Sequence, residues 1–145
     1  MTAKEFLRLA RDADRRIDRA MERVDRLRAR LESGRLNRLT GMPRGGSSDW
    51  TETADRLIEL EKIVNARIRE MCEVKRLAME AIERVEEMRY REVLELYYLD
   101  HYTWDKVAET MQLDRRWVTR LHGKALMKIK IPEEVQQWGN TSIPS

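Results

Sequence analysis

Residues 102–130 constrain the fold more than any other part of the chain, because they have the pattern of two short helices joined by a tight turn. Thr103 is placed to cap the first helix and Asp114 to cap the second. Ala108 is small enough to let the two helices approach closely. Gln112 and Leu113 form the turn between the two helices. These features predict a helix-turn-helix.

The second helix of this pattern, residues 114–129, separates apolar from basic positions at about 100° per residue. An arginine on the exposed side can form two hydrogen bonds with guanine, and a lysine can neutralise a phosphate. We therefore interpret 114–129 as a recognition helix that enters the major groove. Its candidate DNA-binding residues are Arg115, Arg116, Thr119, Arg120, Lys124 and Lys128.

Two aromatic residues in the same helix leave alternatives open. Trp117 either borders the core or packs against a DNA sugar, and His122 either contacts a phosphate or is packed as a structural residue. The aromatic residues of 90–99, together with Trp104, are expected to build the small core on which the helix-turn-helix rests.

Residues 89–130 resemble the helix-turn-helix of sigma-factor domain four, which reads the −35 promoter element. Two runs carry the resemblance, YREVLELYYL at 90–99 and Val107-Ala108-x-x-Met111-x-Leu113-Asp114-x-x-x-Val118. The chain departs from the family at the turn position usually held by glycine, which is Gln112 here. The resemblance implies a left-handed or strained backbone at this residue, at a cost of about 1 kcal/mol. A long helical hairpin precedes the motif, in the place of the sigma domain that melts promoters. This combination is similar to small phage and prophage proteins, including late-gene activators of the RinA and ArpU type. The resemblance implies a transcription regulator that binds double-stranded DNA at a phage promoter, with RNA polymerase as a further partner.

The N-terminal third has apolar residues spaced alternately by four and three, which predicts a long helix with a coiled-coil-type seam. The many arginines of this helix are compatible with a nucleic-acid-binding arm. However, they alternate along the chain with aspartate and glutamate, and this pattern favours a solvated helix face. The seam residues are Phe6, Ala10, Ala13, Ile17, Ala20, Val24, Leu27 and Leu31.

Ser33-Gly34 predicts the end of this helix, and residues 34–49 are rich in glycine, serine and proline, which predicts a flexible loop. Asp49 and Glu52 have the spacing of a capping box at the start of a second helix. The second seam is interrupted at Glu61 and Lys75, and the helix either continues to residue 99 or bends near 86–87. We expect the two long helices to form an antiparallel hairpin within the chain, with a parallel homodimeric coil as the competing arrangement.

Composition favours long amphipathic helices, because 38% of the residues are charged and 6% are aromatic. The lone cysteine, Cys72, is expected to be a buried small hydrophobe, and no catalytic, metal or cofactor site is predicted. The chain has no apolar run long enough for a membrane span and no signal-peptide pattern, so we expect a cytoplasmic protein. Because the acidic residues do not converge with His, Ser or Cys in a recognisable catalytic pattern, we do not expect an enzyme.

The predicted fold is all-α, with a helical hairpin over 1–88, a helix-turn-helix domain over 89–131 and a C-terminal tail over 132–145. We expect a short helix or a turn at 133–138 and disorder after it. Two alternatives to the regulator remain. One is a DNA-packaging component similar to a small terminase subunit, and the other is a protein-interaction module with a sigma-like fold and little affinity for DNA.

Overall fold

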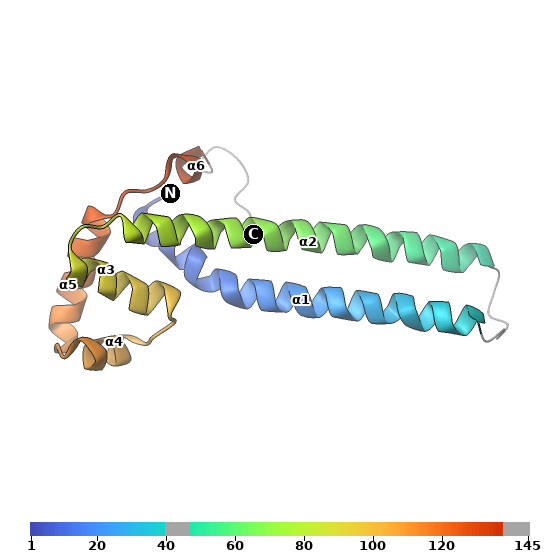
Figure 1. Ribbon diagram of the computed structural model, residues 1–145, viewed down its shortest axis with the longest axis horizontal. Coiled ribbons are helices and arrows are strands. Elements are labelled where there is room, and N and C mark those ends of the chain that lie inside the picture. The colour runs from blue at the N-terminus through green and yellow to red at the C-terminus, as the bar shows by residue number, and fades with distance from the viewer. Residues whose placement is uncertain (40–46, 138–145) are drawn as a thin grey trace. The chain divides into compact units, whose positions relative to one another are not determined.

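The computed structural model describes residues 1–39 and 47–137, and all regular elements in these two ranges are helical (Figure 1). They are α1 (Ala3–Leu39), α2 (Ser47–Glu83), α3 (Met88–Leu94), the π-helix η1 (Glu95–Leu99), α4 (Trp104–Met111), α5 (Arg115–Lys128) and α6 (Glu133–Gln136). The predicted all-α fold with a long hairpin of α1 and α2 is confirmed. The chain divides into two compact units, Arg15–Glu70 and Met1–Asp14 together with Met71–Ser145.

In the unit Arg15–Glu70, α1 and α2 lie side by side and run in opposite directions (Figure 1). Ala20 and Val24 of α1 and Leu57 of α2 are buried, as the apolar spacing predicts. Glu61, which interrupts the second seam, is paired with α1: its carboxylate accepts a hydrogen bond from Arg28 Nε at 2.7 Å. This cross-helix ion pair occupies a polar position at the edge of the apolar contact.

The other unit combines the first part of α1, the last part of α2 and the whole helix-turn-helix. Its core takes side chains from every one of these segments, including Phe6, Leu7, Val74, Ile82, Leu94, Tyr98, Val118 and Val135. The second interruption of the seam, at Lys75, is also paired, here with Asp14 of α1. These compact units do not coincide with the predicted division near residue 88.

The predicted end of the first helix at Ser33-Gly34 is wrong, because α1 continues to Leu39. A glycine inside a helix costs about 1 kcal/mol, which packing can offset. Here a Cβ on Gly34 would collide with the indole of Trp50, so the glycine lets the ring lie against the backbone of α1. The helical residues 34–39 therefore do not belong to a loop.

The start of the second helix also differs from the prediction. Because α2 begins at Ser47, Asp49 lies inside the helix and is not its cap. Residues 40–46 of the predicted loop lie outside the described residues.

The predicted burial of Cys72 is wrong as well, since its side chain is exposed. The buried positions of α2 in this region are 71, 74, 77, 78, 81 and 82, and residue 72 lies on the opposite side of that stripe. The alternative of a bend near residues 86–87 is confirmed, because α2 ends at Glu83 and α3 begins at Met88. The expected C-terminal helix is α6, whereas Trp138 and the residues after it lie outside the described residues.

Candidate nucleic-acid interface

The turn between α4 and α5 is fixed by its backbone hydrogen bonds. Gln112 has φ 57° and ψ 42°, so of the left-handed or strained conformations expected at this position it adopts the left-handed one. The amide of Leu113 donates to Ala108 O at 3.0 Å and that of Gln112 to Glu109 O at 3.2 Å. This pair of bonds is a Schellman motif, which satisfies the last carbonyls of α4.

Both predicted helix caps are present. Thr103 Oγ1 accepts a hydrogen bond from the Lys106 amide at 3.2 Å, and Asp114 Oδ1 accepts one from the Trp117 amide at 2.8 Å. Each cap satisfies one of the free N–H groups in the first turn of its helix. The direction in which α5 begins is therefore set by Asp114 and the preceding turn.

The inner face of α5 is anchored by Val118, His122 and Ala125, which are buried against α3 and α4. His122 Nε2 lies 2.7 Å from the hydroxyl of Tyr98, which is also buried. Next to this pair, the rings of Tyr97 and Trp104 stack with centroids 3.8 Å apart. Of the two roles considered for His122, the structure supports packing and not a phosphate contact.

Burial disfavours charge on this aromatic cluster. It lowers the pKa of His122 to about 4, and the nearby Lys4 and Arg8 act in the same direction. Burial also raises the pKa of Tyr98 to about 12. Both groups are therefore neutral near pH 7, and the inner face of α5 contributes no charge of its own.

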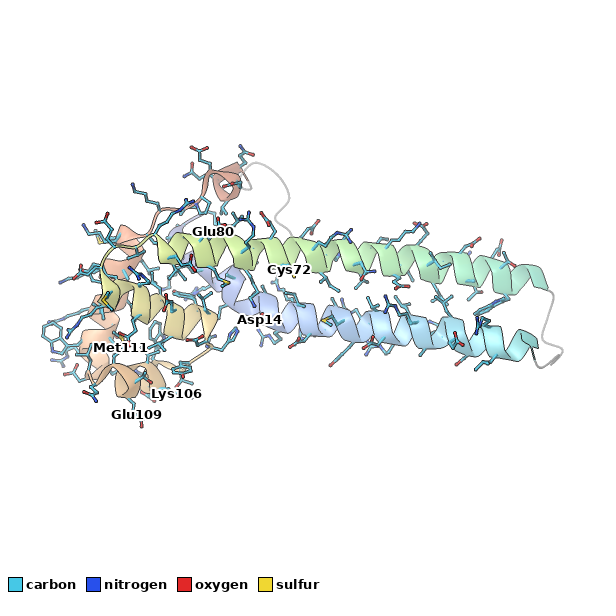
Figure 2. The ribbon with its side chains drawn as sticks, in the orientation of Figure 1. Asp14, Cys72, Glu80, Lys106, Glu109 and Met111 are labelled. Carbon is cyan, nitrogen blue, oxygen red and sulfur yellow. The ribbon has the colours of Figure 1, made fainter. Side chains whose placement is uncertain are left out.

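The loop before α4 is held by α1 and α2. Asp14 pairs with Lys75 and with His101 Nε2, the latter at 2.6 Å, and His101 has φ 62°. Burial raises the pKa of Asp14, but the hydrogen bonds from Lys75 and His101 outweigh it, so this pKa lies below its ordinary value. Figure 2 labels Asp14 on α1. The network connects α1 and α2 to the segment in which α4 begins.

The outer face of α5 holds the candidate DNA-binding residues, all six of which are exposed. Arg116, Thr119 and Arg120 project away from the buried stripe, and Lys124 and Lys128 continue the basic surface toward the end of the helix. Arg115 lies at the flank, where Nη1 is 3.3 Å from Asp105 Oδ1 of α4. The segment Arg115–Lys128 contains five lysines and arginines and no acidic residue.

Two large apolar side chains, Trp117 and Met127, are exposed on the same surface as the basic residues. Met127 was not predicted as part of this surface, because the prediction was based on the basic residues of the helix. Met127 is 84% exposed, and Trp117 is 56% exposed, so Trp117 does not border the core. The Arg120 guanidinium carbon lies 5.5 Å from the centre of the Trp117 ring. At Gly123, a Cβ would meet no atom within 4 Å, so nothing in residues 1–39 and 47–137 explains a glycine there.

On α4, Lys106 and Glu109 are exposed (Figure 2), and the ammonium of Lys106 lies 4.1 Å from the ring centre of Tyr102. Among the described residues, no group of histidine, cysteine and acidic side chains could hold a metal ion. None of the helices in the described ranges has the length and apolar character needed to cross a membrane.

Comparison with protein families identifies the motif. The family model of sigma-70 region 4 matches residues 87–130, which include α3, η1, α4 and α5. No curated protein and no solved structure matches the chain significantly. The segment is therefore a helix-turn-helix that is similar to sigma-70 region 4.

Proposed function

We propose that this protein is a sequence-specific DNA-binding regulator of transcription, with α5 as the helix that enters the major groove. The observation that carries the proposal is the outer face of α5, which is basic and exposed on the second helix of a region-4-type motif. The cap from Asp114 fixes the first turn of α5. In helix-turn-helix proteins the N-terminal residues of the second helix contact the bases, so this turn leads the helix into the groove.

Within this surface, Arg116 and Arg120 read bases, because a bidentate contact from arginine to guanine discriminates against other bases by about 1–3 kcal/mol. Lys124 and Lys128 contact phosphates and carry no sequence information. Thr119 contacts a thymine methyl or a phosphate. Arg115 is partly engaged by Asp105 and serves as a flanking phosphate contact.

The finer part of the proposal concerns the setting. The resemblance to phage activators favours a phage or prophage promoter as the target, and the region-4-type domain favours RNA polymerase as a second partner. The role is binding and not catalysis, in the cytoplasm where promoters are read.

Selection of random duplex DNA by the full chain at near-physiological salt, followed by sequencing, tests the proposal. Enrichment of a defined motif is expected. The pair Arg116→Ala and Arg120→Ala should then abolish this preference, whereas Lys124→Ala and Lys128→Ala, which remove the same charge, should weaken binding equally for all sequences. Loss of preference in both pairs would refute the division of roles, and no enrichment by the wild type would refute the proposal.

The two alternatives predict other results. A packaging component of the small-terminase kind would form a ring-shaped oligomer, which light scattering would detect. A module that binds only proteins would give no salt-sensitive binding to duplex DNA.

A further inference from the structure

The arginines of α1 in the unit Arg15–Glu70 form a stripe that the function of α5 does not use. Arg19, Arg23, Arg26 and Arg30 follow one another at intervals of four, three and four residues. At 100° per residue they fall within a sector of about 60° on the helix. All four side chains are exposed, and the part of the chain that the structure describes offers no ion-pair partner to any of them. We call these four residues the arginine stripe.

Charges that alternate along the sequence are separated on the surface of α1. Asp18 and Asp25 lie roughly 110–130° from the centre of the arginine stripe on one side, with Glu22 nearer at about 70°. The buried seam with Ala20 and Val24 lies about 110° away on the other side. The helix therefore has an apolar, an acidic and a basic face. On an ordinary solvated helix face, positive and negative side chains are mixed, whereas here they lie on separate faces.

The arginine stripe also has an energetic cost within the isolated chain. Arg19–Arg23, Arg23–Arg26 and Arg26–Arg30 are like-charge neighbours at helical spacing, and each such pair destabilises a helix slightly. Glu22 is the one acidic residue three or four positions from any of the four. A polyanionic partner would remove this repulsion.

The geometry points to duplex DNA as that partner: we propose that the arginine stripe is a second DNA contact, which binds phosphates without reading sequence. From Arg19 to Arg30 the helix rises ~16 Å at 1.5 Å per residue, whereas duplex DNA carries about one charge per 1.7 Å of its axis. The DNA thus offers more phosphates than the stripe has arginines. A membrane surface fits less well, because Ala20 and Val24 of the apolar seam are buried. Among the described side chains of α1, the exposed large apolar ones, Met21 and Leu36, are too far apart in sequence to form a face that could insert.

This inference rests on the proposed function, because duplex DNA as the partner follows from it. The surface that it adds lies outside residues 87–130. The test measures DNA affinity of the full chain at several salt concentrations, with both the selected motif and a random duplex. Arg23→Gln, Arg26→Gln and Arg30→Gln remove three charges from the stripe. The matched control, Arg56→Gln, Lys62→Gln and Arg69→Gln, removes three charges from scattered exposed positions of α2 in the same unit.

The salt dependence of binding should fall by about 0.9 in log–log slope for each phosphate that the protein no longer neutralises, hence by up to about 3 for the stripe variant, on both duplexes. The preference for the motif should stay unchanged. The control variant should keep most of the slope. Replacing the same three arginines by lysine retains the charge and should retain the slope, which separates the effect of charge from that of altered folding.

Each other outcome has a definite meaning. If the wild type prefers a motif and the stripe and control variants behave alike, the inference is wrong and the proposed function stands. If the wild type binds DNA without preference and the stripe variant releases it, the stripe is supported and the proposed function fails. No DNA binding by the wild type overturns both. A stripe variant that loses affinity for anionic lipid vesicles but keeps its DNA salt slope also overturns the inference.

Discussion

At the residue scale, His122 shows how the interior of the domain limits what the recognition helix can do. Its ring is 9% exposed, lies 2.7 Å from the Tyr98 hydroxyl and is close to the positive charges of Lys4 and Arg8. Protonation would place a further charge in this apolar, positively charged environment. The position therefore stabilises a neutral imidazole, whose packing orients α5.

This environment makes the stability of the domain depend on pH. The pKa of His122 is about 4 in the folded state and near 6.5 when the chain is unfolded, so between these values the unfolded state binds the proton more tightly. Stability is then complete above about pH 6.5 and falls with acidification toward pH 4, by at most about 3 kcal/mol. Urea unfolding of the wild type across this range should show the decrease.

His122→Gln serves as the control, because its amide can still bond to Tyr98 but does not titrate. The difference in unfolding free energy between wild type and this variant should shrink as the pH falls. Other groups that titrate at acidic pH, such as Asp14, contribute equally to both proteins and cancel in this difference. A difference that does not change with pH would therefore contradict the lowered pKa of His122.

At the element scale, the helix-turn-helix could be predicted closely from sequence because its signals are local. The caps at Thr103 and Asp114 and the left-handed Gln112 each depend on residues within one turn. The end of α1 was predicted wrongly, because Gly34 is held in the helix by Trp50, which is distant in sequence. Cys72 was also misplaced, since its neighbour Met71 is buried and one residue turns the helix by about 100°.

The two helical glycines make a matched pair for mutation. Gly123→Ala should stabilise α5 by about 0.5–1 kcal/mol, since the added Cβ meets no atom and the helix no longer contains the more flexible residue. Gly34→Ala should not give this gain, because the added Cβ overlaps the far end of the Trp50 side chain, which must shift to make room. Urea unfolding curves of both variants measure this difference.

DNA binding of Gly123→Ala then reports on the outer face. If α5 lies in a groove, a methyl group at its exposed centre should weaken binding despite the gain in stability. An unchanged affinity would place the DNA away from residue 123, and it would favour contacts through Arg116 and the N-terminal turn of the helix.

At the scale of the whole molecule, the domain that carries α5 is built from both ends of the chain. Phe6 and Leu7 are 1% and 0% exposed within the same compact unit as the helix-turn-helix. Arg11 donates from Nε to Tyr97 O at 3.0 Å, a carbonyl in the widened turn of η1. Sequence periodicity could assign Phe6 to a helix seam, but it gave no sign of the bond from Arg11 to Tyr97, because that bond joins positions 86 residues apart and no local signal encodes it.

A variant without residues 1–14 should therefore lose the native packing of the helix-turn-helix, although the whole of 87–130 is retained. Phe6→Ala alone should cost about 3–5 kcal/mol, as for other buried aromatic side chains. The near-UV circular dichroism of the stacked Tyr97 and Trp104 reports this packing directly. A truncated chain with the full signal would show that the domain folds without α1.

Shortening the other unit should have the opposite result. If residues 22–63 are replaced by a short Gly-Ser turn, Met1–Asp14 and Met71–Ser145 remain connected, and the near-UV signal should persist. This variant lacks three arginines of the stripe, so it should keep the sequence preference that α5 provides while its binding becomes less sensitive to salt. Loss of the preference would mean that the hairpin takes part in reading the sequence, since a folded domain with an intact α5 would then not be sufficient.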